Sequence, residues 1–558
     1  MSSRLIGLVA FVVTAAIAWG FWSWANAPVE LPDVPNAHVA CPSYAPFRGR
    51  QTPHNESFVA PPEQIAEDMA ILKSVTDCVR LYSARQGLEE VSVQAAQLGM
   101  SVLQGIWIGA NPQNNQMEID AALDVVARNP QAVKAVIVGN EVLLRREQSP
   151  ENLRKLIREV KSRTDKPVTY ADVWEFWMKN RDLADEVDFV TVHILPYWED
   201  EPVSIDDAMA HLSRIIDEVK AAFPNKPIMI GETGWPSEGR TRGPAVPSLV
   251  NQASFVRDFI PLARKLGVDY NLIEAFDQPW KRVQEGTVGG HWGLVDEYRE
   301  QKFPLTGPVV EMPNWHWLAA GGILVAGLLM IAAGRRIPDH EIDEHLGREI
   351  AGWVSAVTAA QLAGATLLLS IDHLSLVNRG PVEWAIGIGL WLVSAVTAVV
   401  LARRWAGPAE ARIQPAPVIE VLRALRRPLG IDWLGAGDGP RGLRLGLLKG
   451  LAAVAVAIAM IGLALDPRYR DFPIVTFLIP AIGWAVDALM PVAGRARTPR
   501  LRLKIEEALL ALMIGGGALA IAIGEGPENG EAHLWALIGL VFAAAVAVAP
   551  RRSQSDSV

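Results

Sequence analysis

The chain has 558 residues, a formal net charge of −9 and a hydrophobic content of 50%. That length is enough for two or more domains, and the first half carries no sustained basic patch, which argues against nucleic acid as a partner. Two cysteines, Cys41 and Cys78, are too few for a disulfide scaffold or a four-cysteine zinc site. They either form one disulfide in an oxidising compartment or remain two thiols in a core.

The first predicted element is an apolar stretch over residues 5–25, preceded by Arg4 and long enough to span a membrane. The Ala-Asn-Ala sequence at 25–27 resembles a signal-peptidase site, but Pro28 directly after it argues against cleavage. We therefore expect residues 1–27 to form an uncleaved transmembrane signal-anchor.

Residues 28–314 alternate short apolar strands with amphipathic helices. The predicted strands cover residues 40–44, 78–82, 102–108, 135–138, 167–171, 189–193, 227–231 and 270–276. The predicted helices between them include residues 61–73, 91–98, 119–129, 151–163, 205–222 and 251–266. Repeated strand–helix units over this length predict an α/β fold, a (β/α)8 TIM barrel, rather than an open doubly wound sheet. No glycine-rich phosphate loop follows the first strand, so we expect no dinucleotide and no other cofactor.

Two glutamates stand at the ends of the predicted fourth and seventh strands. Glu141 lies in the sequence VGNEV at 138–142, and Glu232 lies in IGETGWPS at 230–237. The C-terminal ends of the strands form the active site of TIM barrels, and these two strands lie on opposite sides of the barrel. A retaining glycosidase needs such a facing pair, one carboxyl to protonate the leaving oxygen and one to attack the anomeric carbon. No cluster of His, Asp or Glu has a convincing metal-ligand spacing, so we expect a metal-free reaction.

The two motifs resemble glycoside hydrolase family 17, the β-1,3-glucanases in the clan of barrels with glutamates on strands four and seven. The resemblance extends in order over nearly all of residues 28–314, the soluble half of the chain. It includes residues 80–82, 195–198, 276–281 and 291–295. It implies that Glu141 is the acid/base, Glu232 the nucleophile and Asn140 the contact to the sugar 2-hydroxyl. It also implies that Tyr197 lies close to the nucleophile.

Further residues at the predicted strand ends suit sugar binding. Tyr82 and Trp235 are expected to line the site, and flat tryptophan rings suit the C–H faces of sugars. The expected substrate-binding residues are Asn140, Tyr82, Tyr197, Trp235, Trp280, Lys281 and Trp292, with Trp174, Trp177 and Trp198 as further aromatic candidates. We interpret His193 as a hydrogen-bonded structural residue. The family often has Glu-Asn before the Trp-Lys of strand eight, where this chain has Gln278 and Pro279, which puts a supporting third carboxylate in doubt.

From residue 315 the chain alternates long apolar runs with arginine-rich loops. The apolar runs lie near residues 315–334, 351–371, 384–402, 447–465, 474–493, 507–524 and 534–550, which makes eight spans with the anchor. The basic residues fall in every second connection: Arg335-Arg336, Arg403-Arg404, Arg412 to Arg444, Arg495 to Lys504, and Arg551-Arg552. By the positive-inside rule both termini are cytoplasmic and the soluble half faces outward. In a bacterium this predicts an inner-membrane protein with a periplasmic catalytic domain, 28–314, followed by an all-α polytopic membrane domain, 315–558.

Three functions remain open on this sequence. The first is a transglycosylase that remodels or branches periplasmic β-glucan, and the second is an endo-β-1,3-glucanase. The third is a glucan-binding assembly or transport protein without catalysis, against which the retention of both glutamates argues. Membrane-tethered bacterial members of the family resemble enzymes that edit newly made β-1,3-glucan, which favours the transglycosylase. The expected partners are β-glucan polysaccharide, the lipid bilayer and a membrane glucan synthase.

Overall fold

The structure is a computed structural model that describes residues 3–334, 346–405, 416, 418–426, 440–489 and 505–547. The chain divides into two compact units. One consists of Pro28–Glu311, and the other combines Met1–Ala27 with Met312–Val558. The first unit contains all the named strands, whereas the second is helical in its described parts.

The first unit is a nearly closed barrel of seven parallel strands, which are hydrogen-bonded to one another in chain order. The strands are β1 (Cys78–Arg80), β2 (Ser101–Ile106), β3 (Val133–Asn140), β4 (Val168–Val173), β5 (Val190–His193), β6 (Ile228–Thr233) and β7 (Asp269–Leu272). The segment predicted as the first strand lies between the two edges of this sheet, where Ser43 bridges Arg80 and Pro42 bridges Leu272. The predicted (β/α)8 fold is thus confirmed, with its first strand reduced to isolated bridges.

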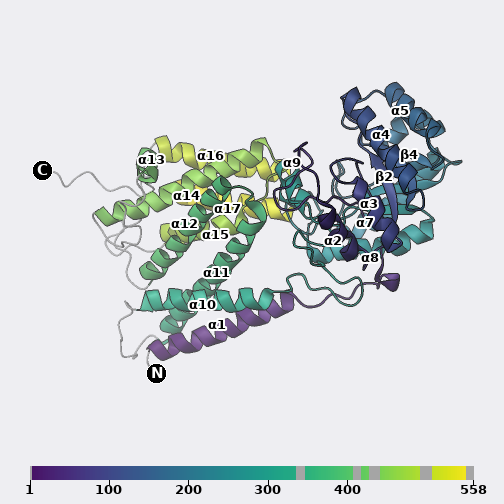
Figure 1. Cartoon of the computed structure of the whole chain (residues 1–558). Coiled ribbons are helices and arrows are strands. Elements are labelled where there is room, and N and C mark those ends of the chain that lie inside the picture. Colours follow the sequence, from purple (N-terminus) through teal and green to yellow (C-terminus); the bar gives the residue numbers. More distant parts are fainter. Residues whose placement is uncertain are drawn as a thin grey trace. The chain divides into compact units, whose positions relative to one another are not determined.

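The helices of this unit lie outside the strands (Figure 1). They are α2 (Pro62–Leu72), α3 (Glu89–Leu98), α4 (Pro112–Arg128), α5 (Pro150–Ser162), α6 (Trp174–Lys179), α7 (Ile205–Ala222), α8 (Leu249–Leu266) and α9 (Arg282–Glu285). Short 3-10 turns occur at Pro35–Ala37, Arg181–Asp185, Pro279–Lys281 and Thr287–Gly290. Ser149, Ser204 and Ser248 cap α5, α7 and α8 by accepting a hydrogen bond from an amide of the first turn. The apolar faces of the helices bury a continuous core against the outside of the sheet.

Inside the barrel the chemistry of the side chains changes along the strands. One apolar cluster consists of Cys41, Cys78, Leu103, Ala135, Ile137, Ala171 and Met229. Further toward the C-terminal strand ends, the buried side chains include Arg80, Asn140 and His193. Burying such polar groups is costly unless they are paired, so their presence marks the site that the barrel supports.

Cys41 and Cys78 form a disulfide that joins the first-strand segment to β1. This decides between the two alternatives left open by the sequence. The bond closes a loop with a sequence separation of 37 residues. A cross-link of this kind stabilises a protein chiefly by restricting the unfolded chain.

We expect the double substitution Cys41→Ala with Cys78→Ala to destabilise the barrel by about 3–4 kcal/mol, the chain-entropy value for a loop of this length. Thermal unfolding of the full chain in detergent, followed by tryptophan fluorescence, measures the change in Tm. The single substitution Cys41→Ala should lower the stability of the barrel about as much as the double substitution, because either removes the cross-link. A double variant that melts with the wild type would contradict a stabilising role.

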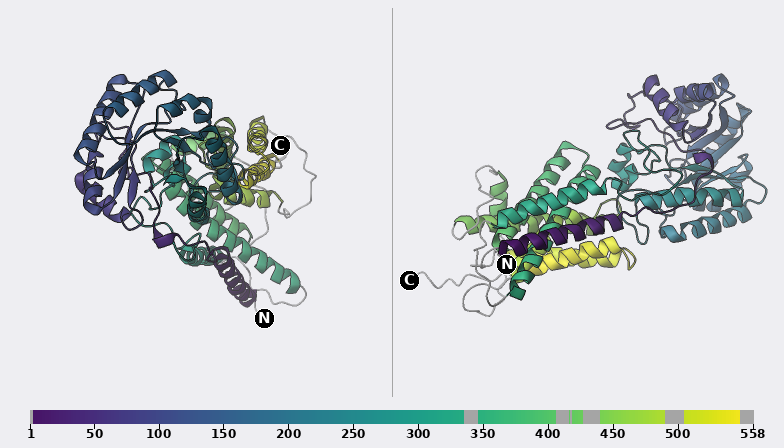
Figure 2. Two further views of the ribbon diagram at one scale, coloured as in Figure 1. Left: turned by 90° about the vertical axis from the view of Figure 1, so that its right-hand side faces the viewer. Right: turned by 90° about the horizontal axis from the view of Figure 1, so that it is seen from below.

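The second unit is a bundle of helices: α1 (Ser3–Ala25), α10 (Trp315–Gly334), α11 (Leu346–Val377), α12 (Pro381–Trp405), α13 (Val418–Arg426), α14 (Pro440–Leu465), α15 (Ile474–Leu489), α16 (Ile505–Gly524) and α17 (Gly530–Ala547). The N-terminal helix α1 packs beside α10 and α11, although the whole of the first unit separates them from it in the sequence (Figures 1 and 2). Helix α13 was not predicted from the sequence.

Seven of the described helices are long and apolar enough to cross a membrane: α1, α10, α11, α12, α14, α16 and α17. Helix α15, the sixth predicted span, has 16 described residues, and residues 490–493 of that prediction lie outside the described residues. The arginine-rich connections on which the predicted orientation rests also lie wholly or partly outside them.

Candidate active site

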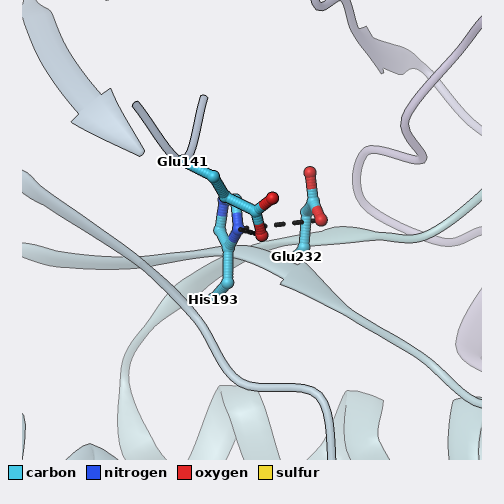
Figure 3. A group of neighbouring side chains, drawn as sticks. All are labelled: Glu141, His193 and Glu232. Atoms are coloured by element: carbon cyan, nitrogen blue, oxygen red, sulfur yellow. Dashed lines mark hydrogen bonds and ion pairs between the residues drawn. The ribbon is translucent and has the colours of Figure 1, made fainter. Parts of the chain in front are cut away.

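Glu141 and Glu232 meet at the C-terminal ends of the strands. Glu141 follows β3 directly, and Glu232 lies on β6. Figure 3 shows their carboxyl groups beside the ring of His193. One carboxylate oxygen of each glutamate and Nδ1 of His193 lie within 4.8 Å of one another. Retaining glycosidases hold their two carboxyl groups roughly 5–5.5 Å apart, whereas inverting ones leave roughly 6.5–9.5 Å for a water molecule. The spacing here suits direct attack by a carboxylate.

Glu141 is carried on a tight turn at the end of β3. Gly139 has a φ of 86° and Glu141 itself a φ of 54°, which is a region that residues with a Cβ rarely adopt. The Glu141 amide donates to the carbonyl of Ala171 on the neighbouring β4 at 2.8 Å. The guanidinium of Arg145 donates to the carbonyl of Asn140. The turn therefore presents Glu141, whose side chain is 23% exposed, at the mouth of the barrel.

The residue before Glu232 must be small. A Cβ on Gly231 would lie 2.6 Å from Cγ2 of Thr191 and 2.9 Å from Cδ2 of His193, both on β5. Only glycine allows β6 to approach those side chains this closely. The glycine of the GETG sequence therefore keeps Glu232 and His193 side by side.

Glu232 is held as a carboxylate by cations and hydrogen-bond donors. Its Oε1 accepts from Nη1 of Arg80 at 2.9 Å and from the hydroxyl of Tyr82 at 2.8 Å. Burial would raise the pKa of Glu232, but the charges of His193, Arg80 and Lys281 outweigh burial and hold it well below its ordinary value. A carboxyl group that acts as a nucleophile must be ionised and held in place, and Glu232 meets both conditions.

His193 is the hydrogen-bonded, buried residue that the sequence led us to expect, and its partners are the two glutamates themselves. Its fully buried ring places Nδ1 at 3.2 Å from Oε1 of Glu141 and 3.6 Å from Oε2 of Glu232. Burial would lower the pKa of His193, but the carboxylates of Glu232 and Glu141 outweigh burial and raise it. The sequence signal was its position at the end of a strand, two residues before the Leu-Pro-Tyr-Trp segment.

The imidazolium of His193 makes the stability of the barrel pH-dependent. Because its pKa is raised in the folded state, its stabilisation is fully present below the ordinary pKa of histidine and is lost as pH rises through the raised one. We expect His193→Gln to cost roughly 3 kcal/mol at pH 6, as removal of one member of a buried charge pair does. The difference in Tm between wild type and variant should be smaller at pH 9 than at pH 6. A difference that does not change with pH would contradict a charged His193 as the source of this stability.

A second group of charges lies beside Glu232. Arg80 also donates through Nη2 to Oδ1 of Asn140 at 2.5 Å, which fixes the amide that is expected to contact the sugar. Lys281 donates to both carboxylate oxygens of Glu274 at 2.9 and 3.0 Å. Burial would lower the pKa of Lys281, but Glu274 raises it, so the ammonium charge is retained. Glu274, which follows β7, is therefore a buried carboxyl group paired with Lys281.

The predicted aromatic residues divide into two sets. Tyr197, Trp235 and Trp292 are almost completely buried, and the hydroxyl of Tyr197 donates to the carbonyl of Arg240. They belong to the core cluster, and a ring buried in this way has no exposed face for a sugar. Tyr82 and Trp280 remain half-buried, and Nε1 of Trp280 donates to Oε1 of Gln278 at 2.9 Å.

One exposed aromatic residue was missed by the sequence interpretation. Trp107 follows β2 and is 39% exposed. The guanidinium of Arg145 lies 4.1 Å from the centre of its ring, and Arg145 also holds the turn of Glu141. Its position just beyond a strand end was the available signal, as for Tyr82.

Glu141, His193 and Glu232 form a group that could hold a metal ion, although no spacing in the sequence indicates it. The electrostatics of the group argue for a different role. Arg80 already pairs with Glu232, and the charges of Glu232 and Glu141 outweigh burial and raise the pKa of His193, so a metal cation would compete with Arg80 for Glu232 and with a proton for His193. The arrangement suits an imidazolium between two carboxyl groups.

Comparison with known proteins gives consistent similarities. A family model described as the BtgE/BtgC glycoside hydrolase domain matches residues 41–293. The chain is 29% identical over 314 residues to the putative glucan endo-1,3-beta-glucosidase btgC of Aspergillus niger, with 50% of this chain and 44% of that protein covered. It is 30% identical over 256 residues to the glucan 1,3-beta-glucosidase of Arthroderma benhamiae, with 42% of this chain and 82% of that protein covered.

Among solved structures, an active-site mutant of the Rhizomucor miehei beta-1,3-glucanosyltransferase in complex with laminaritriose is similar, with 27% identity and a TM-score of 0.43. That comparison covers 49% of this chain and 98% of the other. The chain spans less than half the length of the Aspergillus niger and Emericella nidulans btgC relatives that it matches.

Proposed function

Because the chain belongs to the BtgE/BtgC glycoside hydrolase family, as the resemblance of its motifs to family 17 led us to expect, we propose that it is a retaining enzyme acting on β-1,3-glucan. The observation that carries the proposal is the close approach of Glu141 and Glu232, each of which has a carboxylate oxygen within 4.8 Å of one from the other. The names of the glucan 1,3-beta-glucosidase relatives support the substrate class.

The proposed reaction has two steps. Oε2 of Glu232, the oxygen not bonded to Arg80 and Tyr82, attacks the anomeric carbon while Glu141 gives its proton to the glycosidic oxygen that leaves. A glycosyl ester forms on Glu232, and Arg80 and Tyr82 stabilise the carboxylate that is released later. Glu141, now deprotonated, takes the proton of an incoming hydroxyl group, which attacks the same carbon and restores the β configuration.

The incoming hydroxyl decides between a transglycosylase and a hydrolase. We favour a sugar hydroxyl, and therefore a transglycosylase that remodels or branches β-glucan. The seven described helices that are long and apolar enough to cross a membrane support this proposal, because an enzyme fixed in a membrane acts on polymer made or held at that membrane. The names of the curated relatives, which are glucosidases, favour hydrolysis as the second candidate. A binding protein without catalysis would need neither glutamate in this geometry.

We propose that the unit Pro28–Glu311 faces the periplasm of a bacterium, that the chain crosses the inner membrane eight times and that both termini are cytoplasmic. The distribution of arginines supports this orientation. The Cys41–Cys78 disulfide supports it independently, because such bonds persist in oxidising compartments. A membrane glucan synthase is the partner that would supply the polymer.

The test uses the full chain in detergent with laminari-oligosaccharides labelled at the reducing end. Labelled products longer than the substrate, or products with new branch linkages, would support transfer. If all labelled products were shorter than the substrate, the enzyme would be a hydrolase and the transglycosylase proposal would be wrong. Glu232→Ala serves as the inactive control, and treatment with a chelator should leave the rate unchanged if the reaction is metal-free.

A further inference from the structure

Two residues of β4 lie behind the turn that carries the proposed acid/base. Tyr170 and Asp172 are both buried, at 1% and 0% exposure. Ala171 between them belongs to the cluster inside the barrel, whereas Tyr170 belongs to the core between sheet and helices. Successive side chains of a strand point to opposite faces, so Tyr170 and Asp172 share the outer face of β4. They cannot touch a sugar in the mouth of the barrel.

These side chains converge on one backbone amide of the Glu141 turn. The amide of Leu143 donates to the hydroxyl oxygen of Tyr170 at 3.1 Å and to Oδ2 of Asp172 at 3.3 Å. The hydroxyl of Tyr170 in turn donates to Oδ2 of Asp172. The amide of Val173 donates to Oδ1 of Asp172 at 2.8 Å. Three donors therefore meet one carboxyl group, and none of them belongs to the catalytic pair.

The turn needs such support. Glu141 has a φ of 54°, a conformation that is strained for any residue with a Cβ and persists only where the surroundings fix it. Its own amide is bonded to Ala171, also on β4. With the amide of Leu143 held by Tyr170 and Asp172, the backbone is anchored to β4 at Glu141 and again two residues later.

Asp172 is suited to accept these bonds. Burial raises its pKa to about 6, although the hydrogen bond from Tyr170 and the charge of His193 oppose burial. Above that pH the group is a carboxylate, which can only accept, as three converging donors require.

We propose that Tyr170 and Asp172 are a positioning pair, which sets the place of the Glu141 carboxyl through the amide of Leu143. The inference rests on the proposed function, because it concerns proton delivery by Glu141. Proton delivery requires the carboxyl to lie within hydrogen-bond reach of the leaving oxygen, and a displacement of about 1 Å in a catalytic group can cost about 10²-fold in rate.

The test compares two substrates of the full chain in detergent, a laminari-oligosaccharide and the 2,4-dinitrophenyl β-glycoside of laminaribiose. A sugar leaving group needs the proton from Glu141, whereas dinitrophenolate leaves without it. We expect Asp172→Asn to lower kcat/KM about 10²-fold for the oligosaccharide and only a few-fold for the dinitrophenyl glycoside. Tyr170→Phe keeps the ring and its packing. It should also lower kcat/KM for the oligosaccharide more than kcat/KM for the dinitrophenyl glycoside.

Tyr270→Phe is the matched control. Tyr270 is a buried tyrosine of β7 whose hydroxyl accepts from the amide of Ala40 at 3.3 Å. Removal of this hydroxyl should leave the ratio of the two kcat/KM values unchanged. Equal losses on both substrates in the Asp172 and Tyr170 variants would overturn the inference, since a general loss of structure affects both alike. No loss in either variant would overturn it as well. A wild type that turns over neither substrate would instead refute the proposed function.

Discussion

Glu232→Ala is expected to lower turnover of β-1,3-glucan by on the order of 10⁶, the loss that follows removal of a covalent nucleophile in a hydrolytic enzyme. The substitution removes the attacking oxygen and leaves a space facing the anomeric carbon. Sodium azide can enter that space, so a dinitrophenyl glycoside should react again and yield a glycosyl azide of inverted, α configuration. Product analysis by nuclear magnetic resonance reads that configuration directly.

Glu118→Gln is the control for this experiment. Glu118 is a buried glutamate of α4 in the same unit, and it accepts hydrogen bonds from the hydroxyl of Ser83 and the amide of Ala84. The variant should keep its activity, and azide should not change its products. If Glu232→Ala retained normal turnover of glucan, or if azide gave no α product, Glu232 would not be the nucleophile.

The two glutamates proposed as the catalytic pair were predictable because each stands near the end of an apolar run and in a distinctive local sequence. Position at a strand end is a property of the chain itself, so Glu141 and Glu232 could be placed at one face of a barrel before any coordinates. The distance between them could not be predicted, since it depends on the turn of Glu141 and on the close approach that Gly231 allows.

The surrounding charges were harder to foresee. Arg80, His193 and Glu274 come from β1, from β5 and from the segment after β7, and no sequence spacing brings them together. A buried histidine in a strand is usually a packed, hydrogen-bonded residue, and His193 is one whose Nδ1 faces the carboxyl groups of both glutamates. For Tyr197, Trp235 and Trp292, the sequence could show that aromatic rings lie near strand ends but not how completely they are buried.

The short first strand has a related physical cause. Residues 40–44 pair with both neighbours only through single bridges, because Pro42 lacks an amide hydrogen and cannot extend a ladder. The disulfide to Cys78 holds this segment where a full set of strand hydrogen bonds would otherwise do so. The sequence pattern identified a strand there correctly, but the proline limits how much of it can form.

Glu141→Ala should have a different signature from the nucleophile variant. Loss of general acid catalysis lowers the rate on glucan by about 10²–10⁴-fold, whereas the first step with a dinitrophenyl glycoside needs no proton and should remain close to wild type. The glycosyl ester on Glu232 should then accumulate, because the base that activates the incoming hydroxyl is missing. A burst of dinitrophenolate followed by slow turnover, seen by stopped-flow absorbance, measures this.

Azide assigns the two roles independently of rate. In Glu141→Ala the glycosyl ester on Glu232 has already inverted the anomeric carbon once, so azide entering beside residue 141 must invert it again and give the β-glycosyl azide. The α product expected from Glu232→Ala and the β product expected from Glu141→Ala cannot both arise if the assignment is reversed. An exchange of the two configurations would therefore contradict the roles proposed for the two glutamates, even if both variants lost activity on glucan.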